Sequence, residues 1–399
     1  AQTVHDLTGL SGTSTALSDA LTAAASGDII LLGPGETYNA GYAFDKSILI
    51  RPHDPSGEMP VIDCGTNFNF DTDAVIDSVV FEGIKFTGTF DGKYVLNADQ
   101  NATVGEIRYD GCRLHNLRGI TRIKGGTGTL EKFSMNNCVA DSIRDYGILT
   151  VDADTWACDN ISLTNSTFSR TRGFITNRNN TSSVIIDGCT LNEVPAAGQT
   201  MFRWRTSGQN TVDALTIKNT IMGHGWDEAG TGPTAFRGFE GTITWDIQNT
   251  YATSDLSFSS SPIPGFPNMV YDGTAEDLWV DPVQMDFTIA DGLFFGIGKA
   301  GDPRWGFVPV VNLLAGWDGD GITGEGSRPN EVGWINPAAD AATLWNLANA
   351  AGGCRFRDYD VAGGHTGFTH ELDGSTITTR QFMLRWDGGA YSTSCLLYT

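Results

Sequence analysis

The sequence predicts an all-β protein whose first part is a parallel β-helix, because three observations point to one solenoid repeat. An eight-residue pattern of strand, bend and short strand recurs seven times within residues 79–252. Two apolar columns and one Gly/Asn column run through all the copies. The bends, at residues 83, 111, 137, 165, 188, 219 and 249, are spaced about two dozen to 30 residues apart, which suits one solenoid coil with loops of variable length.

The columns have direct physical meanings. Apolar residues at the first and third positions, with polar residues between them, predict a strand with one buried face. A bend position that holds only Gly or Asn predicts a left-handed backbone with positive φ. An antiparallel β-sandwich with similar hairpins is the alternative, but it gives no reason to keep one Gly/Asn column. The first apolar column is Val79, Ile107, Phe133, Ile161, Val184, Leu215 and Trp245, and the second is Phe81, Tyr109, Met135, Leu163, Ile186, Ile217 and Ile247.

A helix and two strands are expected before the repeats. Residues 14–27 predict a short amphipathic helix with Leu17, Ala20 and Leu21 on one face. Residues 29–32 and 47–52 are apolar and predict buried strands. Because a solenoid must cover its open apolar end, we interpret the helix as an N-terminal cap.

A second set of strands lies between the repeats, and each should form another face of the same coil. These strands are expected at residues 94–97, 120–124, 147–151, 173–178, 201–205 and 235–239. The repeat fades after Thr253, and residues 278–305 are interpreted as a C-terminal cap that ends at Arg304 and Trp305. We therefore assign residues 1–310 to a β-helix with two caps.

Residues 311–399 predict a separate domain, a β-sandwich of the jelly-roll kind. Trp and Phe recur there at strand-like intervals, and residues 381–386 alternate as a strand does. The chain stops at residues 395–399 in what reads as an unfinished strand. This leaves two interpretations: the domain is incomplete, or self-association through the open sandwich edge completes the sheet.

Charge and composition limit the partners. The chain has 25 Lys and Arg against 47 Asp and Glu, a net charge of −22, which argues against nucleic acid because phosphates need a basic partner. It contains no run of about 18 apolar residues, so no membrane span is expected. A start at Ala1 suits a mature end, and the acidic surface is common in secreted proteins, so we expect a secreted or cell-surface location.

Three of the seven cysteines occupy one column directly after the bend. They are Cys112, Cys138 and Cys189, and the same position holds Ser166 or Thr220 in other copies. Small residues stack well there, which favours buried free thiols. A disulfide between Cys112 and Cys138 is the alternative.

Basic residues gather in the second set of strands. Since equivalent positions on successive coils stack about 4.8 Å apart, six cations should lie on one face of an acidic protein. These cations are Arg122, Lys124, Arg178, Arg203, Arg205 and Arg237, and Tyr146, Asn177 and Trp204 belong to the same strands. Arginine pairs with carboxylate or sulfate, and aromatic rings stack on sugars, so the set predicts a groove for an acidic polysaccharide.

Specific roles follow from this hypothesis. A lyase that acts on uronates needs a cation to neutralise the carboxylate and a base to take the C5 proton. We assign catalysis to Arg203, Arg205 and Arg237, with Lys124 or Tyr146 as the base. Substrate binding is assigned to Arg122, Arg178, Asn177 and Trp204. The alternative is that the arginines form ion pairs with nearby acids such as Asp145, Asp152 and Glu240.

The N-terminal segment and the Gly/Asn column together resemble pectate-lyase-like right-handed parallel β-helices. The resemblance rests on a helix followed by Gly27-Asp28, an apolar strand, Pro34-Gly35 and Tyr38, and it extends over about residues 12–305. It implies a right-handed solenoid of a secreted, carbohydrate-active bacterial kind. Calcium-dependent members carry clustered acidic ligands beside a catalytic Arg, and polygalacturonase-like members carry three clustered Asp residues. Neither set is present in the sequence, so no family catalytic residue is carried over.

Two further hypotheses concern a cation and a non-enzymatic role. Asp318, Asp320 and Glu325 lie in a Gly-rich loop whose alternating carboxylates suit calcium, although the spacing is not that of an EF-hand and an ordinary Gly turn is the alternative. A capped solenoid with an open sandwich edge also suits a structural subunit of an extracellular fibre, sheath or surface layer.

Overall fold

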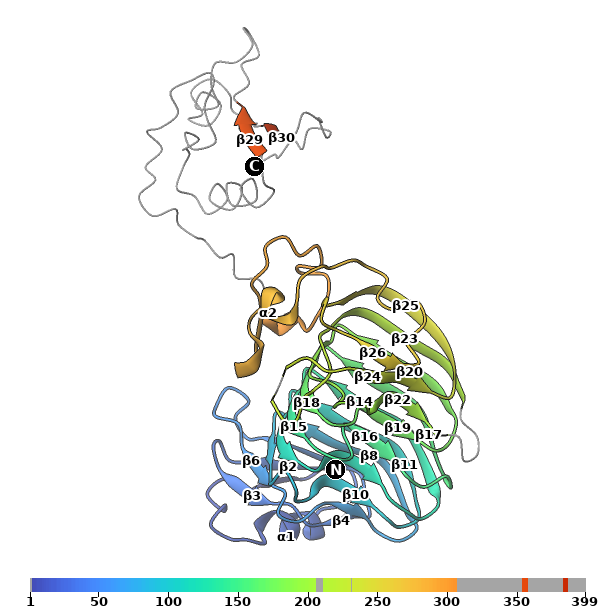
Figure 1. Cartoon of the computed structure of the whole chain (residues 1–399). Coiled ribbons are helices and arrows are strands. Elements are labelled where there is room, and N and C mark those ends of the chain that lie inside the picture. The colour runs from blue at the N-terminus through green and yellow to red at the C-terminus, as the bar shows by residue number, and fades with distance from the viewer. Residues whose placement is uncertain (1, 206–210, 231, 307–353, 358–382, 387–399) are drawn as a thin grey trace, which may run out of the picture. The chain divides into compact units, whose positions relative to one another are not determined.

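The computed structural model describes residues 2–205, 211–230, 232–306, 354–357 and 383–386. The chain divides into two units, one made of Ala1–Ile289 with Phe294–Gly306 and the other of Ala290–Leu293 with Phe307–Thr399. In the first unit the chain winds into a parallel β-solenoid of about nine turns (Figure 1). This confirms the prediction of an all-β parallel β-helix.

Each complete coil contributes strands to three parallel ladders, which we call the first, second and third ladders. The first ladder contains the longest strands and runs through nine coils after β1 (Val4–Asp6). Its members are β2 (Asp28–Leu32), β5 (Ile48–Pro52), β8 (Ala74–Glu82), β11 (Ala102–Asp110), β14 (Gly128–Asn136), β17 (Trp156–Thr164), β20 (Thr181–Asp187), β23 (Thr211–Met222) and β25 (Thr242–Ala252).

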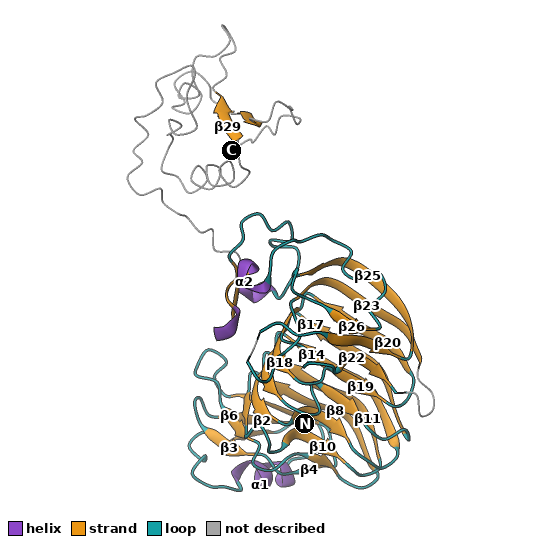
Figure 2. Cartoon of the chain, in the orientation of Figure 1, coloured by secondary structure: helices purple, strands orange, loops and turns teal. Residues whose placement is uncertain are grey.

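The second and third ladders contain shorter strands (Figure 2). The second ladder continues into the last residues of β23 and β25, because Thr190 pairs with Ile221 and Ile221 with Tyr251. Its strands are β3 (Thr37–Asn39), β6 (Val61–Asp63), β9 (Lys85–Thr87), β12 (Arg113–Leu117), β15 (Val139–Ile143), β18 (Thr167–Thr171) and β21 (Thr190–Asn192). The third ladder consists of β10 (Tyr94–Ala98), β13 (Gly119–Ile123), β16 (Leu149–Val151), β19 (Ile175–Asn177), β22 (Thr200–Trp204), β24 (Phe236–Glu240) and β26 (Phe258–Ser260), after the short pair β4 (Ala43–Phe44) and β7 (Asn69–Phe70).

The register confirms the columns read from the sequence. Val79 pairs with Ile107, Ile107 with Phe133, and the series continues to Leu215 and Trp245. The bend residues all have positive φ, from 48° at Asn165 to 63° at Gly111. The Gly/Asn column is therefore a left-handed bend that turns the chain from the first ladder into the second.

Gly111 allows the backbone requirement to be tested separately from packing. A Cβ atom built there meets nothing closer than 3.9 Å, so added side-chain atoms have room. We expect Gly111→Asn to be nearly neutral, because Asn occupies this bend on other coils. Gly111→Val should lower the free energy of unfolding by about 1–2 kcal/mol, because a β-branched residue is strained at positive φ. Urea unfolding of both variants tests this, and equal stability of the two would contradict it.

The interior is a continuous stack of apolar side chains. Phe81 packs face to face with Tyr109 at 5.2 Å between ring centroids, and Tyr109 contacts Phe133 on the next coil at 6.1 Å. The cysteine column is buried, and the five cysteines described with their side chains are free thiols. The Cys138 thiol donates to the carbonyl of Asn136 at 3.3 Å. Buried free thiols are thus confirmed, and the Cys112–Cys138 disulfide is wrong.

The N-terminal end has the expected helix. α1 spans Ala16–Ala23 and buries Ala16, Leu17, Ala20 and Leu21, which join the solenoid core. At the other end, Ile263 and Phe266 from the loop after β26 also join this core. Each end of the apolar stack therefore receives side chains from outside the three ladders.

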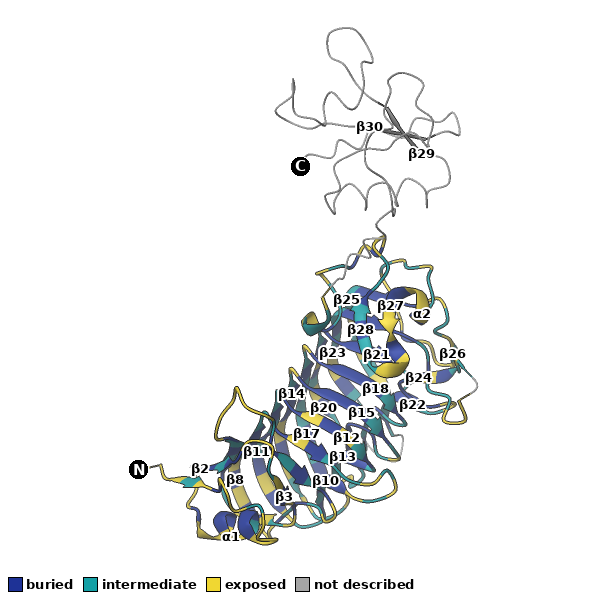
Figure 3. Ribbon diagram, turned by 90° about the vertical axis from the view of Figure 1, so that its left-hand side faces the viewer, coloured by how far each residue is buried: buried dark blue, intermediate teal, exposed yellow. Residues whose placement is uncertain are grey.

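The segment expected to be the C-terminal cap lies along the side of the coils. It contains α2 (Ala275–Leu278), β27 (Trp279–Asp281), β28 (Asp286–Ile289) and a short 3-10 turn at Pro303–Trp305. Asp302 accepts a hydrogen bond from Thr167 at 2.7 Å, and Arg304 donates to Asn137 at 2.8 Å. These contacts place the end of the segment against the second ladder and against the bends of the Gly/Asn column, beside the middle coils (Figure 3).

In the second unit, two strands are described, β29 (Cys354–Arg357) and β30 (Met383–Trp386), which pair antiparallel. β30 lies within the strand expected at residues 381–386. The remainder of the predicted sandwich, including its open edge, falls outside the described residues. Within the described parts of both units, no helix is long and apolar enough to cross a membrane.

Candidate functional site

The third ladder positions the predicted cations in two adjacent outward columns. One column contains Arg122 and Arg203, because Arg122 pairs with Thr150, Thr150 with Thr176, and Thr176 with Arg203. The other lies two residues later, just after the strands end. It holds Asp99, Lys124, Asp152, Arg178 and Arg205, since the residues before them, Ala98 to Trp204, are aligned. We call Arg122, Lys124, Arg178, Arg203 and Arg205 the basic face.

Most cations of the basic face have a carboxylate partner. Arg122 donates to Asp152 at 2.8 Å, and Arg178 lies 3.8 Å from the same carboxylate. Lys124 lies 3.1 Å from Asp99. Arg203 lies 2.9 Å from Glu240. The alternative interpretation of local ion pairs is therefore correct for these residues, including the expected partners Asp152 and Glu240.

Arg205 differs from the other members of the face. It forms no ion pair with a described residue, and its backbone N–H donates to the carbonyl of Asn177 at 2.9 Å. Partial burial, followed by repulsion from Arg203 and Arg178, lowers the pKa of the Arg205 guanidinium. Three guanidinium groups thus lie close enough to repel one another, and the nearby carboxylates Asp152 and Glu240 offset this only in part. Such a location favours an additional anion.

The ring of Tyr146 packs against the guanidinium group of Arg122. The guanidinium carbon of Arg122 is 3.9 Å from the centroid of the Tyr146 ring, and that of Arg118 is 5.4 Å away. Tyr94 meets Tyr146 edge to face at 5.4 Å. The Tyr146 ring therefore helps to fix Arg122 through cation–π contact.

Two residues assigned to substrate binding, Asn177 and Trp204, point into the core of the solenoid instead of outward. Asn177 and Trp204 are 0% exposed and lie in the inward column with Ile123 and Val151. Both donate to the hydroxyl of Thr181, at 2.9 and 3.0 Å. Their assignment is wrong, because alternate residues of a strand face opposite sides and these two face the core.

Arg237 does not belong to the same cluster. On β24 it aligns with Thr200, whereas Glu240 aligns with Arg203, so Arg237 lies three residues earlier along the strand, or about 10 Å. Its guanidinium donates to the carbonyl of Gly198 at 2.9 Å. The structure thus separates Arg237 from Arg203 and Arg205.

The structure contains another row of cations, which was not predicted from the sequence. Arg118, Arg144 and Arg172 each follow an aligned residue of the second ladder, so they stack along the corner that leads to the third ladder. All three surround Asp145, at 3.3 to 3.6 Å. The sequence pattern could have revealed this row, because Leu117, Ile143 and Thr171 precede the three arginines at the spacing of the repeat.

A pocket of about 600 Å³ lies elsewhere, between the bend column and residues 287–306. Asn165, Asp187 and Trp305 are among its lining residues. Polar groups of its wall bond to one another: Asn219 donates to Asp187 at 2.9 Å, and the backbone N–H of Asp302 donates to the hydroxyl of Thr190 at 2.9 Å. None of the predicted site residues lines this pocket.

The predicted calcium ligands Asp318, Asp320 and Glu325 lie outside the described residues. Within the ranges that the structure describes, no group of three or more His, Cys, Asp or Glu side chains could hold a metal ion.

Family comparisons cover much of the solenoid. Residues 37–171 match a family model described as a domain of unknown function, DUF4957. Residues 184–305 match a second family model described as a domain of unknown function, DUF5123. No curated protein matches the chain. The chain is thus similar, over most of its coils, to two families whose descriptions assign no activity.

Proposed function

We propose that the protein binds an acidic polysaccharide along the basic face of the third ladder. The observation that carries the proposal is the group of Arg178, Arg203 and Arg205, in which Arg205 has no carboxylate partner among the described residues and is repelled by the other two. A carboxylate or sulfate group beside Arg205 would relieve that repulsion and accept charge-assisted hydrogen bonds.

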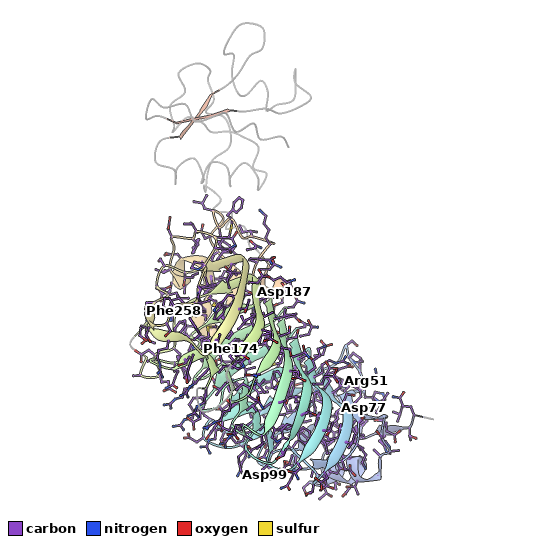
Figure 4. The ribbon with its side chains drawn as sticks, turned by 90° about the vertical axis from the view of Figure 1, so that its right-hand side faces the viewer. Arg51, Asp77, Asp99, Phe174, Asp187 and Phe258 are labelled. Atoms are coloured by element: carbon purple, nitrogen blue, oxygen red, sulfur yellow. The ribbon has the colours of Figure 1, made fainter. Side chains whose placement is uncertain are left out.

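The shape of the face supports a chain-like ligand. From Asn97 to Glu240 the outward column crosses six strands, a length of about 24 Å at ~4.8 Å per step. Asp99, Phe174 and Phe258 follow one another along this side of the solenoid in Figure 4. Cations on the coils of β13, β19 and β22 lie along this strip, which suits a polymer that carries negative charges at intervals.

Substitution of Arg205 tests the proposal. We expect Arg205→Gln to weaken binding to an acidic polysaccharide by about tenfold or more, because one charge-assisted contact contributes roughly 1.5–3 kcal/mol. Affinity electrophoresis in gels that contain pectate, alginate or heparin measures this. Arg51→Gln is the matched control, because Arg51 lies on β5 of the first ladder, forms no ion pair with a described residue, and carries the same charge (Figure 4). Equal retention of the two variants would contradict the proposal.

Eliminative cleavage is a second candidate for the same face. It is favoured by Arg203 and Arg205, which flank Trp204 and face outward together, since two adjacent cations can neutralise a uronate carboxylate and stabilise the charge that develops at C5. Lys124 or Tyr146 would take the C5 proton of a uronate, the C4–O4 bond would break, a C4=C5 double bond would form, and the proton removed from C5 would pass to the leaving oxygen. Ultraviolet absorbance of the double bond follows the reaction. If the polymer retains the protein but the absorbance does not change, the face binds the polymer without cleaving it.

We infer further that the solenoid is a right-handed helix of the pectate-lyase-like superfamily and that it acts outside the cell or on its surface. The helix before the first coil, the left-handed bend column and the acidic composition support this assignment.

A further inference from the structure

The second ladder places two cations next to each other on its exposed face. Lys85 pairs in register with Arg113, so their backbones lie about 4.8 Å apart. Both side chains are exposed, and neither forms an ion pair with a described residue. In a chain with 47 carboxylates against 25 Lys and Arg, two adjacent cations without a carboxylate are a departure from the general pattern.

A histidine–aspartate pair lies beside these cations. His115 is two residues after Arg113 on the same strand, so both side chains point to the same face. The Nδ1 atom of His115 lies 3.0 Å from Oδ2 of Asp141, and the side chains are 52% and 11% exposed. Asp141 also accepts hydrogen bonds from Arg170 at 2.6 Å and from Ser142 at 3.1 Å.

These contacts fix the ionisation of Asp141 and the orientation of His115. Burial alone would raise the pKa of Asp141, but hydrogen bonds from His115 and Arg170 outweigh it and hold the pKa below the usual value. An ionised Asp141 keeps a proton on Nδ1 of His115 and leaves Nε2 for another partner. When His115 is protonated, Nε2 becomes a third positively charged donor beside Lys85 and Arg113.

Arg113 is held close to a further cation. Partial burial and repulsion from Arg304 lower the pKa of the Arg113 guanidinium, while Asp302 opposes this effect. Arg304 itself is occupied, because it donates to Asp302 at 2.7 Å and to Asn137 at 2.8 Å. The free hydrogen-bonding capacity at this place therefore belongs to Arg113, Lys85 and His115.

We propose that Lys85, Arg113 and His115 form a second ligand site, which binds an oxyanion: a carboxylate, sulfate or phosphate group. The planar guanidinium of Arg113 presents two parallel donors to such a group, Lys85 supplies a point charge, and Nε2 of His115 donates the third contact. Asp141 acts as a positioning residue that holds the imidazole. The site lies on the second ladder and is separate from the basic face of the third ladder.

The experiment follows the imidazole of His115 by NMR during pH titrations of the full chain. Sodium acetate, sulfate and phosphate are added in separate arms at constant ionic strength, so the arms distinguish the three oxyanions. The bound anion should shift the imidazole resonances of His115 toward those of the imidazolium form, because a nearby negative charge favours that form. His53 is the internal reference, since its Nδ1 lies 3.0 Å from Asp6 and its side chain is 47% exposed.

Variants identify the residues responsible. Arg113→Gln and Lys85→Gln should each weaken the anion affinity read from the His115 signal by about tenfold. Arg51→Gln and Arg205→Gln should leave it unchanged, which also separates this site from the basic face. The proposal is overturned if no anion shifts His115, if His53 shifts equally, or if the Lys85→Gln/Arg113→Gln double variant retains the full effect.

Discussion

Replacing Trp204 with alanine is expected to lower the free energy of unfolding by about 3–5 kcal/mol, the usual cost of removing a fully buried tryptophan. Trp204 is 0% exposed and lies at the end of β22, inside the coils. Its indole N–H donates to Thr181 at 3.0 Å, so the substitution removes a hydrogen bond as well as packing. Urea unfolding measures the loss. Hydrogen exchange should show it first in β19 and β24, because each coil contacts only its neighbours.

Two variants control for this effect. Arg205→Ala changes the next residue, whose side chain faces outward, and should alter stability by less than about 0.5 kcal/mol. Trp204→Phe keeps most of the apolar volume and should cost less than Trp204→Ala. If Trp204→Ala kept full stability but lost retention on acidic polysaccharide, the expectation would be contradicted, because the side chain would have to lie on the surface.

The fold could be predicted because its repeat depends on local physics. Positive φ at the bend admits Gly and Asn at little cost, so seven residues of only these two types mark seven bends. Alternation of apolar and polar residues marked the first ladder, as Ile107 and Tyr109 with Arg108 between them illustrate. A second left-handed position, at Asn116, Ser142, Arg170 and Glu193, escaped notice because its residue types share no chemistry.

The sequence itself contains a pattern that contradicts the assignment of Asn177 and Trp204 to substrate binding. Both stand in a column with Ile123 and Val151, and an apolar column in a solenoid belongs to the interior. Arg203 and Arg205 flank Trp204 and therefore face outward by simple alternation. An aromatic ring can bind a sugar only where it is exposed, and the period of the strand turns Trp204 into the core.

Other features depend on contacts that local sequence does not encode. Arg237 is separate from the cluster because the connection from β23 to β24, residues 223–235, determines where β24 begins, and the repeat pattern does not encode its path. The segment at residues 275–306 was expected at the end of the solenoid. Its contacts join Thr167 to Asp302, residues 135 positions apart, and no repeat pattern reports on such a pair.

The three ladders divide the surface of the solenoid among different environments. The third ladder carries the basic face, and the second carries the Lys85, Arg113 and His115 site on its early coils. From Val139 onward, residues 275–306 cover the second ladder, so Ser169 and Asn192 are buried although they face outward. The covering segment therefore decides how much of the second ladder remains open to a ligand.

Arg304→Ala is expected to release this segment from the coils, at a cost of about 3–5 kcal/mol. Arg304 is the ion-pair partner of Asp302, whose side chain is 0% exposed, and the pair lies 2.7 Å apart. Without Arg304, a buried carboxylate keeps only neutral donors such as Thr167. Faster hydrogen exchange and proteolysis within residues 275–306, with unchanged exchange in β14 and β17, would report the release. Unchanged protection of the segment would contradict the expectation.

The pH dependence of that variant identifies the cause. Burial already raises the pKa of Asp302 above its ordinary value of 3.8, and loss of Arg304 should raise it further. A raised carboxyl pKa means that the docked form binds the proton more tightly than the released form, so docking strengthens as pH falls through the raised pKa and weakens above it. The double variant Asp302→Asn/Arg304→Ala removes the charge altogether and should dock better than Arg304→Ala at neutral pH. If both variants lost the segment equally at every pH, the hydrogen bonds of Arg304 to Asn137 and Cys138, rather than the buried charge, would hold it in place.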